Sequence, residues 1–379
     1  MVVYPGSPHV NNWDFLTRRS KSKSSSPLRF YIQLATQDGY EVSADAPRQD
    51  PDLLSAVLKK ELCLDRGRLF QGNASKRLDK NAFVMFPSRN MLEVKIITAW
   101  LLELGATVYY FDVPGAWGLF KSELLERSRT GVVLLHPSMT QYYQMPGLHT
   151  ILLTTSTNFF QLGHDATLRY DPERYDPDGA TQYSCVRLFP TGGATLVTDD
   201  VFEFTPKLAL GVLDTFYKAG ENKPRGGKND RIVTRPGIKA WLLDLADKYA
   251  SDANIGHRLK LYESACRLLP DESEDDRVRL PNEEPPLLVS PSVADMPGYS
   301  TLWDQDESEA TDTLVAWFAA WCIHEREQFR RFMVVHEQSR RPENTPGLGA
   351  EKDPREWSRK YNHIRVVNSQ RWIQSRGKK

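Results

Sequence analysis

The hydrophobic positions between residues 81 and 153 alternate between short apolar runs and stretches with helical spacing. The short runs are FVMF at 83–86, TVYYF at 107–111, GVVLL at 131–135 and TILL at 150–153. Between the first three runs, residues 91–104 and 117–127 carry apolar side chains three and four positions apart, as amphipathic helices do. This alternation predicts four buried strands in a mainly parallel sheet, Rossmann-like, with helices on both faces.

The same kind of pattern resumes after residue 184. Two further strands are predicted at 185–189 and 194–198, and the Pro190-Thr191-Gly192-Gly193 segment between them predicts a hairpin turn. Thr205 and Pro206 are typical of a helix start, and Ile232-Val233 is a brief strand. Another helix is expected from Pro236 onward.

The chain divides by composition into five segments. We expect a flexible basic and Ser-rich tail at 1–27, a small N-terminal unit or extension at 28–80, an α/β core domain at 81–269, an acidic Pro-rich linker at 270–310, and an added C-terminal segment at 311–379. That last segment holds a predicted helix at 311–328 and strands at 332–336 and 363–367, which we expect to pack on the core.

Charge and composition exclude several classes of function. Lysine plus arginine equals aspartate plus glutamate at 49 each, so no global field recruits nucleic acid or an anionic membrane. No apolar run approaches the ~20 residues of a membrane span. The four cysteines are far apart and form no CxxC pair, which argues against a cysteine-based zinc site. We therefore expect a protein of the cytosol or nucleus without membrane partners.

Acids that follow predicted strands are the strongest candidates for chemistry. Asp112 follows TVYYF, and Asp199 and Asp200 follow ATLVT. Ligands of open parallel sheets lie beyond the carboxyl ends of the strands, where carboxylates could hold Mg²⁺ for phosphodiester cleavage. Aspartate is also common in such places because it caps and turns the chain. FVMF ends in Pro87 and GVVLL in His136, so the acid set of a metal nuclease is incomplete.

No complete catalytic motif accompanies these acids. The chain lacks a phosphate loop, a dinucleotide fingerprint, a HExxH helix, an EF-hand loop and a GxSxG elbow. His136 could serve as a base, but the sequence fixes no partner for it, and a structural role is favoured. No cofactor is expected, and Mg²⁺ enters only with the nuclease alternative.

Basic residues gather in two places that could bind RNA. The first is the weak candidate set Lys223, Arg225, Lys228 and Arg231. The second is the stretch 355–379, where three aromatic residues lie between the basic ones. Basic and aromatic side chains together can hold RNA through phosphate contacts and base stacking. The alternative is a solvated basic face with its aromatic residues in the core.

Several blocks of the chain carry a resemblance to a known family. They are FVMFPSRNMLEVKIITAWLLELGATVYYF, RTGVVLLHPSM, LFPTGGATLVTDDVF, and QFRRFMVVHE followed by WSRKYNHIRVV. Across about residues 80–370 they resemble the C-terminal regions of filamentous-fungal chromodomain proteins of the Chp-one type, which act in RNA-guided heterochromatin silencing.

The resemblance implies a degenerate PIN-like fold that serves as a scaffold for partner proteins. The incomplete acid set noted above agrees with that expectation. It further implies a nuclear, non-catalytic subunit of a gene-silencing complex, with protein partners and RNA as a further partner. The chain departs from the family because it has no chromodomain-like block, so histone-tail binding is not carried over. We expect it to be part of such a protein or a divergent relative.

Overall fold

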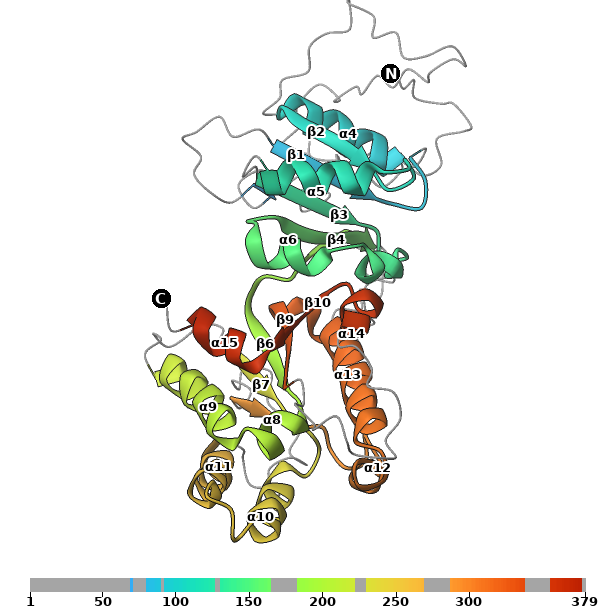
Figure 1. Ribbon diagram of the computed structural model, residues 1–379. Coiled ribbons are helices and arrows are strands. Elements are labelled where there is room, and N and C mark those ends of the chain that lie inside the picture. Colours follow the sequence, from blue (N-terminus) through green and yellow to red (C-terminus); the bar gives the residue numbers. More distant parts are fainter. Residues whose placement is uncertain are drawn as a thin grey trace, which may run out of the picture. The chain divides into compact units, whose positions relative to one another are not determined.

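The computed structural model describes residues 69–70, 80–89, 92–126, 130–164, 183–221, 230–268, 287–337 and 355–376. The chain divides into two units, Met1–Arg68 and Leu69–Lys379. The expected tail at 1–27 and nearly all of the unit at 28–80 lie outside the described residues. Within the described part, two five-stranded sheets are flanked by helices, which confirms the predicted α/β class with mainly parallel strands (Figure 1).

The first sheet has the strand order β2-β1-β3-β4-β5. Its strands are β1 (Lys80–Met85), β2 (Ala106–Tyr110), β3 (Thr130–Leu135), β4 (Asn158–His164) and β5 (Tyr183–Leu188). The first four are parallel, and β5 runs antiparallel to β4. The connecting helices are α4 (Leu92–Glu103), α5 (Ala116–Glu126), the 3₁₀ turn η2 (Thr140–Gln144) and α6 (Leu148–Thr154). Gly105 ends α4 in the left-handed region at φ 74°, which is typical of a glycine at a helix C-terminus.

The predicted strand TILL at 150–153 is wrong, because this segment belongs to α6. Leu148, Ile151 and Leu152 are buried together at helical spacing, and Gly147 at φ 72° precedes the helix. A run of four apolar residues fits a helix turn and a buried strand equally well, so periodicity alone could not decide. The fourth strand begins eight residues after the predicted start, as β4.

The second sheet is entirely parallel and has the order β10-β9-β6-β7-β8. Its strands are β6 (Thr191–Val197), β7 (Arg231–Val233), β8 (Leu288–Val289), β9 (Phe329–His336) and β10 (Ile364–Asn368). The accompanying helices are α8 (Asp199–Phe204), α9 (Pro206–Glu221), α10 (Ile238–Lys248), α11 (Ile255–Leu268), α12 (Tyr299–Gln305), α13 (Glu307–His324), α14 (Arg355–Lys360) and α15 (Ser369–Arg376), with the 3₁₀ turn η5 (Glu325–Glu327). This is a doubly wound order, which reverses direction between β6 and β9.

Helices cover both faces of the second sheet (Figure 1). Leu196 and Val334 belong to the core cluster that includes α13, whereas Val197 and Val335 belong to the cluster formed with α9, α10 and α15. Neighbouring residues of one strand therefore enter opposite cores, as the period of two in a strand requires. This explains why β6 and β9 read as continuous apolar runs.

The predicted hairpin at Pro190–Gly193 is also wrong. β5 belongs to the first sheet and β6 to the second, so the turn is a corner between sheets. Phe189 and Gly192 have positive φ angles of 52° and 74°, and the Phe189 amide donates to the Arg326 carbonyl at 2.6 Å. This corner is possible because β6 pairs with β7 and β9 rather than with the preceding strand.

The expected linker at 270–310 is part of the fold from residue 287 onward. It supplies β8, α12 and the start of α13, and Leu288, Tyr299 and Trp303 from this segment are buried. Its acidic residues and prolines predicted a linker, and the apolar residues between them were not recognised as parts of helices and a strand. The C-terminal strands, which were expected to pack on the core, provide β9 in the middle and β10 at the edge of the second sheet.

Arg330 of β9 joins the two sheets. Its guanidinium donates to the carbonyls of Leu152, Thr155, Thr157 and Phe189 at 2.8–3.2 Å. Burial lowers the pKa of this arginine to about 10. Arg330 is thus a direct link between the C-terminal segment and the first sheet.

Candidate functional site

The carboxyl end of β6 is the position where a sheet of this topology would host a ligand. The strand order reverses between β6 and β9, and the crevice at such a reversal is the usual binding site of doubly wound folds. Thr198 follows β6 in an extended conformation and precedes α8, which begins with Asp199 and Asp200. Two of the three predicted acids therefore lie at this reversal.

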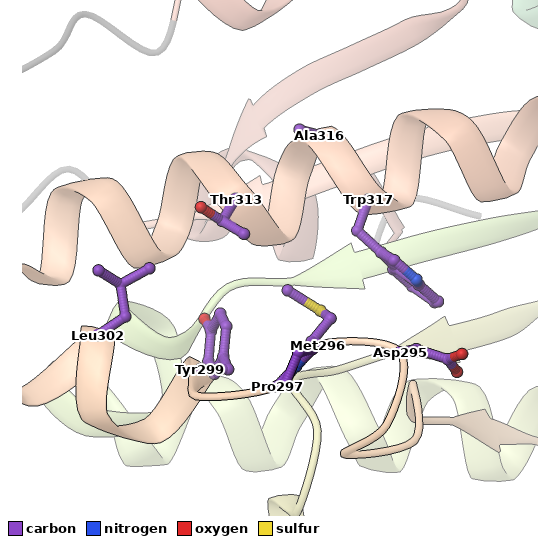
Figure 2. Close-up of a pocket in the computed structure, with 8 residues that line it drawn as sticks. All are labelled: Asp295, Met296, Pro297, Tyr299, Leu302, Thr313, Ala316 and Trp317. Carbon is purple, nitrogen blue, oxygen red and sulfur yellow. The ribbon is translucent and has the colours of Figure 1, made fainter.

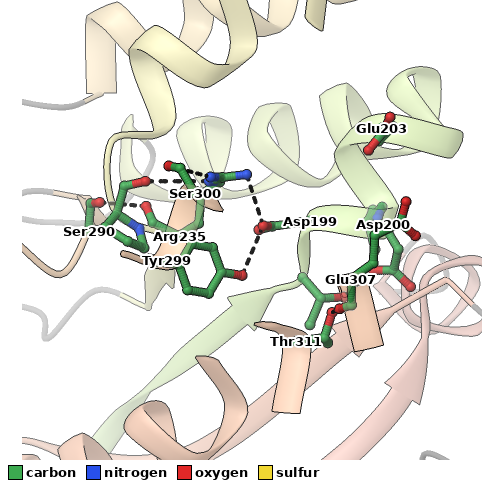
Figure 3. A network of polar contacts seen from close by, with 12 residues as sticks. Asp199, Asp200, Glu203, Arg235, Ser290, Tyr299, Ser300, Glu307 and Thr311 are labelled. Atoms are coloured by element: carbon green, nitrogen blue, oxygen red, sulfur yellow. Dashed lines mark hydrogen bonds and ion pairs between the residues drawn. The ribbon is translucent and has the colours of Figure 1, made fainter. Parts of the chain in front are cut away.

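Asp199 is committed to an internal ion pair. Its side chain is 0% exposed, and Oδ2 lies 3.1 Å from Nη1 of Arg235, which is 1% exposed (Figure 3). The same Oδ2 accepts a hydrogen bond from the Tyr299 hydroxyl at 2.9 Å. The carboxylate therefore has its charge balanced within the protein and offers no exposed atom to a substrate.

Arg235 is held in place by aromatic rings and a hydroxyl. Its guanidinium carbon lies 4.2 Å from the ring centroid of Trp241 and 5.0 Å from that of Tyr299. It also donates to the Ser300 hydroxyl at 3.0 Å. A desolvated guanidinium gains from ring contacts of this kind, so the rings and Asp199 together stabilise a buried cation.

Asp200 ties together the ends of the two strands at the reversal. One carboxylate oxygen accepts hydrogen bonds from the Thr198 hydroxyl and from the Val201 amide at 2.9 Å. The other accepts from the Glu337 amide, directly after β9, at 2.9 Å. The Thr198 amide also donates to the Val335 carbonyl at 3.0 Å. The crevice is therefore bridged by the protein's own hydrogen bonds.

Burial shifts the protonation of these groups. It raises the pKa of Asp199 to about 6, although Arg235 acts in the opposite direction. It raises the pKa of Asp200 to about 7. The pKa of Tyr299 is also raised, first by burial and then by the charge of Asp199. A raised carboxyl pKa suits a general acid only where the group reaches a substrate, and here the geometry gives these aspartates structural roles.

Asp112 does not join the other two acids. It follows β2, the edge strand of the first sheet, and its carboxylate lies 2.7 Å from Nε of the exposed Arg89. Asp199 and Asp200 belong to the second sheet. Over the described ranges, no group of three or more histidine, cysteine, aspartate or glutamate side chains is placed to hold a metal ion.

The first sheet has its own strand reversal, between β1 and β3. Arg89 follows β1, and His136 and Ser138 follow β3. The His136 amide donates to the Met85 carbonyl at 2.9 Å, and its ring Nδ1 lies 2.7 Å from the Ser138 hydroxyl. His136 is thus oriented by its own turn, which agrees with the structural role favoured for it.

The predicted RNA-binding residues are not shown as one surface. Arg231 lies in β7 and is only 4% exposed, so it does not present its charge to a nucleic acid. Lys223, Arg225 and Lys228 lie outside the described residues. In the C-terminal basic stretch, Trp372 is buried and stacks on Phe216 at 5.5 Å, so it is a core residue rather than a base-stacking platform.

A second feature is an apolar groove on the α13 side of the second sheet, which Figure 2 shows. The turn before α12, α12 itself and α13 supply its lining. The lining residues are Asp295, Met296, Pro297, Tyr299, Leu302, Thr313, Ala316 and Trp317. The groove shares Tyr299 with the ion pair, so its floor is fixed by the same hydrogen bond that holds Asp199.

Sequence reasoning did not find the buried roles of Arg235 and Tyr299. Arg235 lies two residues after a short buried strand, and an arginine between a strand and a Pro-Gly turn was a usable signal. Tyr299 lay within the expected linker and gave none. Comparison with known proteins adds no identification: no protein-family model and no curated protein matches the chain. Among the described helices, none is long and apolar enough to cross a membrane.

Proposed function

We propose that the chain is a non-catalytic scaffold subunit of a nuclear heterochromatin gene-silencing complex. The observation that carries the non-catalytic part is the commitment of Asp199 to Arg235 and Tyr299 at the strand reversal. The nuclear and silencing parts rest on the sequence resemblance to the fungal chromodomain proteins.

The energetics of the ion pair support a structural role. A catalytic carboxylate must reach its substrate or a metal, whereas Asp199 would have to leave a fully buried arginine to do so. Removing one partner of such a pair leaves an uncompensated buried charge, which is strongly unfavourable. The Asp199 carboxylate is therefore poorly suited to move during catalysis and well suited to hold the surrounding elements rigidly together.

The groove beside α13 supports the protein-interaction part. Grooves with an apolar floor are a common docking surface for segments of partner proteins. Its walls come from α12 and α13, and rigid helices hold a binding surface in a fixed shape.

The two alternatives have less support. A metal nuclease built on Asp112, Asp199 and Asp200 would need these acids in one site, and they belong to two different sheets. RNA binding through the segment 223–231 could not use Arg231, because this side chain is buried.

Co-purification from nuclei tests the proposal. The tagged full chain, expressed from its own locus, is expected to co-purify with silencing-complex proteins, and deletion of the locus is expected to raise transcripts from heterochromatic reporters. Nuclear exclusion of the protein, or unchanged reporter transcripts after deletion, would contradict it.

A further inference from the structure

We infer that the groove between α12 and α13 binds a short amphipathic segment of a partner protein, with apolar side chains flanked by lysine or arginine. This rests on the proposed scaffold function and names the chemistry of the partner. Two properties of the groove support this inference: its apolar lining and the charge of the segment that supplies this lining.

The lining is apolar and held from beneath. Met296 and Tyr299 are buried at the floor, and Leu302 lies one turn beyond Tyr299 on α12. On α13, Ala316 and Trp317 form part of one helical face. Trp317 is fixed by stacking on Trp321, with ring centroids 6.2 Å apart. The groove is therefore pre-formed, which lowers the entropic cost of binding.

The segment that supplies the groove lining carries charge of only one sign. Residues 287–323 contain six acids and no lysine, arginine or histidine; the acids are Asp295, Asp304, Asp306, Glu307, Glu309 and Asp312. Asp295 lines the groove and is exposed, and the exposed Glu309 lies one helical turn before Thr313. Arg235 lies next to Tyr299, but it is 1% exposed and paired with Asp199. A partner with basic flanks is the complementary one.

This charge also argues against a second copy of the chain as the occupant. A two-fold self-contact would place the acidic rim of one groove against that of the other, and like charges at an interface are unfavourable. The acids of the first turn of α13 also favour the helix dipole, and Asp306 caps the helix. Asp295 has no such role on α13, and Glu309 faces the groove side of that helix, so the rim charge extends beyond helix capping.

A fluorescent peptide of alternating leucine and lysine blocks, which folds as an amphipathic helix, tests the inference against the full chain. Its counterpart with glutamate in place of lysine is the charge control. We expect the lysine peptide to bind by fluorescence anisotropy and the glutamate peptide not to bind. Ala316→Arg, which fills the groove and repels the peptide, should weaken binding by at least about tenfold.

A second variant reverses the charge at the rim of the groove. Asp295→Lys with Glu309→Lys should weaken binding several-fold at low salt, and the difference should shrink at high salt. The matched control is Asp244→Lys with Asp247→Lys, which makes the same change in net charge at exposed positions on α10 and should leave affinity unchanged. Circular dichroism melts establish that each variant folds.

Three outcomes of the peptide assay would overturn the inference. They are equal binding of both peptides, equal loss in the α10 control, and unchanged binding in both groove variants. Binding that appears only after Arg18, Arg19, Lys21 and Lys23 are changed to alanine would assign the groove to this chain's own basic segment instead. If groove variants still co-purify with silencing proteins, the inference fails while the scaffold proposal stands.

Discussion

Each sheet has an arginine–aspartate pair at the carboxyl ends of two neighbouring strands, β1 and β2 in the first sheet and β7 and β6 in the second, and the two pairs lie in opposite environments. At the first sheet, Arg89 and Asp112 form an exposed pair, with side chains 52% and 42% exposed. At the second sheet, Arg235 and Asp199 form a pair that is 1% and 0% exposed and carries aromatic and hydroxyl partners. The same two residue types therefore serve as a solvated contact in one place and as a buried joint in the other, and burial decides which.

The largest expected effect is the loss of one partner from the buried pair. Arg235→Ala should lower the free energy of unfolding by about 3–5 kcal/mol, because it leaves Asp199 buried without its cation. Urea denaturation monitored by tryptophan fluorescence measures this. The double variant Asp199→Leu with Arg235→Met should lose much less than the single variant; an equal or larger loss would show that the pair is not the source of the effect.

Removing the tyrosine hydroxyl should have an intermediate effect. Tyr299→Phe keeps the ring at the groove floor and deletes one hydrogen bond to a carboxylate, for an expected loss of about 1.5–3 kcal/mol. The same urea titration measures it. Tyr217→Phe, at an exposed position on α9, is the control and should change little. A Tyr299 variant as stable as the wild type would mean that Arg235 alone holds Asp199.

The pH dependence of stability separates the buried acids from the buried histidines. Asp200 has a folded pKa of about 7, above its unfolded value, so its contribution to stability is lost as pH rises from about 4 toward 7. His336 and His363 have pKa values lowered by burial to about 4, so their contribution is lost as pH falls below about 6.5. In Asp200→Asn, the free energy of unfolding should therefore rise more steeply between pH 4 and 6.5. Parallel profiles of variant and wild type would contradict this.

The smallest effect is expected at the exposed pair. Asp112→Asn should change the free energy of unfolding by less than about 1 kcal/mol, and added salt should erase the difference. Urea titrations at low and high salt measure it. A loss comparable with that of Arg235→Ala would remove the contrast between the two pairs.

The sequence predicted the elements whose apolar spacing was long enough to have a clear period. β1, α4, β2, α5 and β3 were expected at nearly their observed positions. The run 150–153 was too short to separate helix from strand, and the hairpin at 190–193 failed because pairing depends on strands distant in the chain.

The sequence predicted only part of the candidate site. Asp199 and Asp200 were found because they follow a strand directly. The partners of these aspartates could not be predicted, because Tyr299 lies one hundred residues from Asp199 and only the folded sheet brings them together. The sequence pattern around a carboxylate at a strand end is the same whether the carboxylate faces a substrate or a buried arginine.

The measurement closest to the central proposal is silencing by the apolar double variant. The locus is replaced with Asp199→Leu and Arg235→Met, and transcripts from a heterochromatic reporter are counted alongside the protein level. A structural role for the pair predicts that reporter transcripts stay at the wild-type level. Reporter transcripts as high as in the deletion strain, at an unchanged level of folded protein that still binds the lysine peptide, would show that Asp199 acts chemically and would contradict the scaffold proposal.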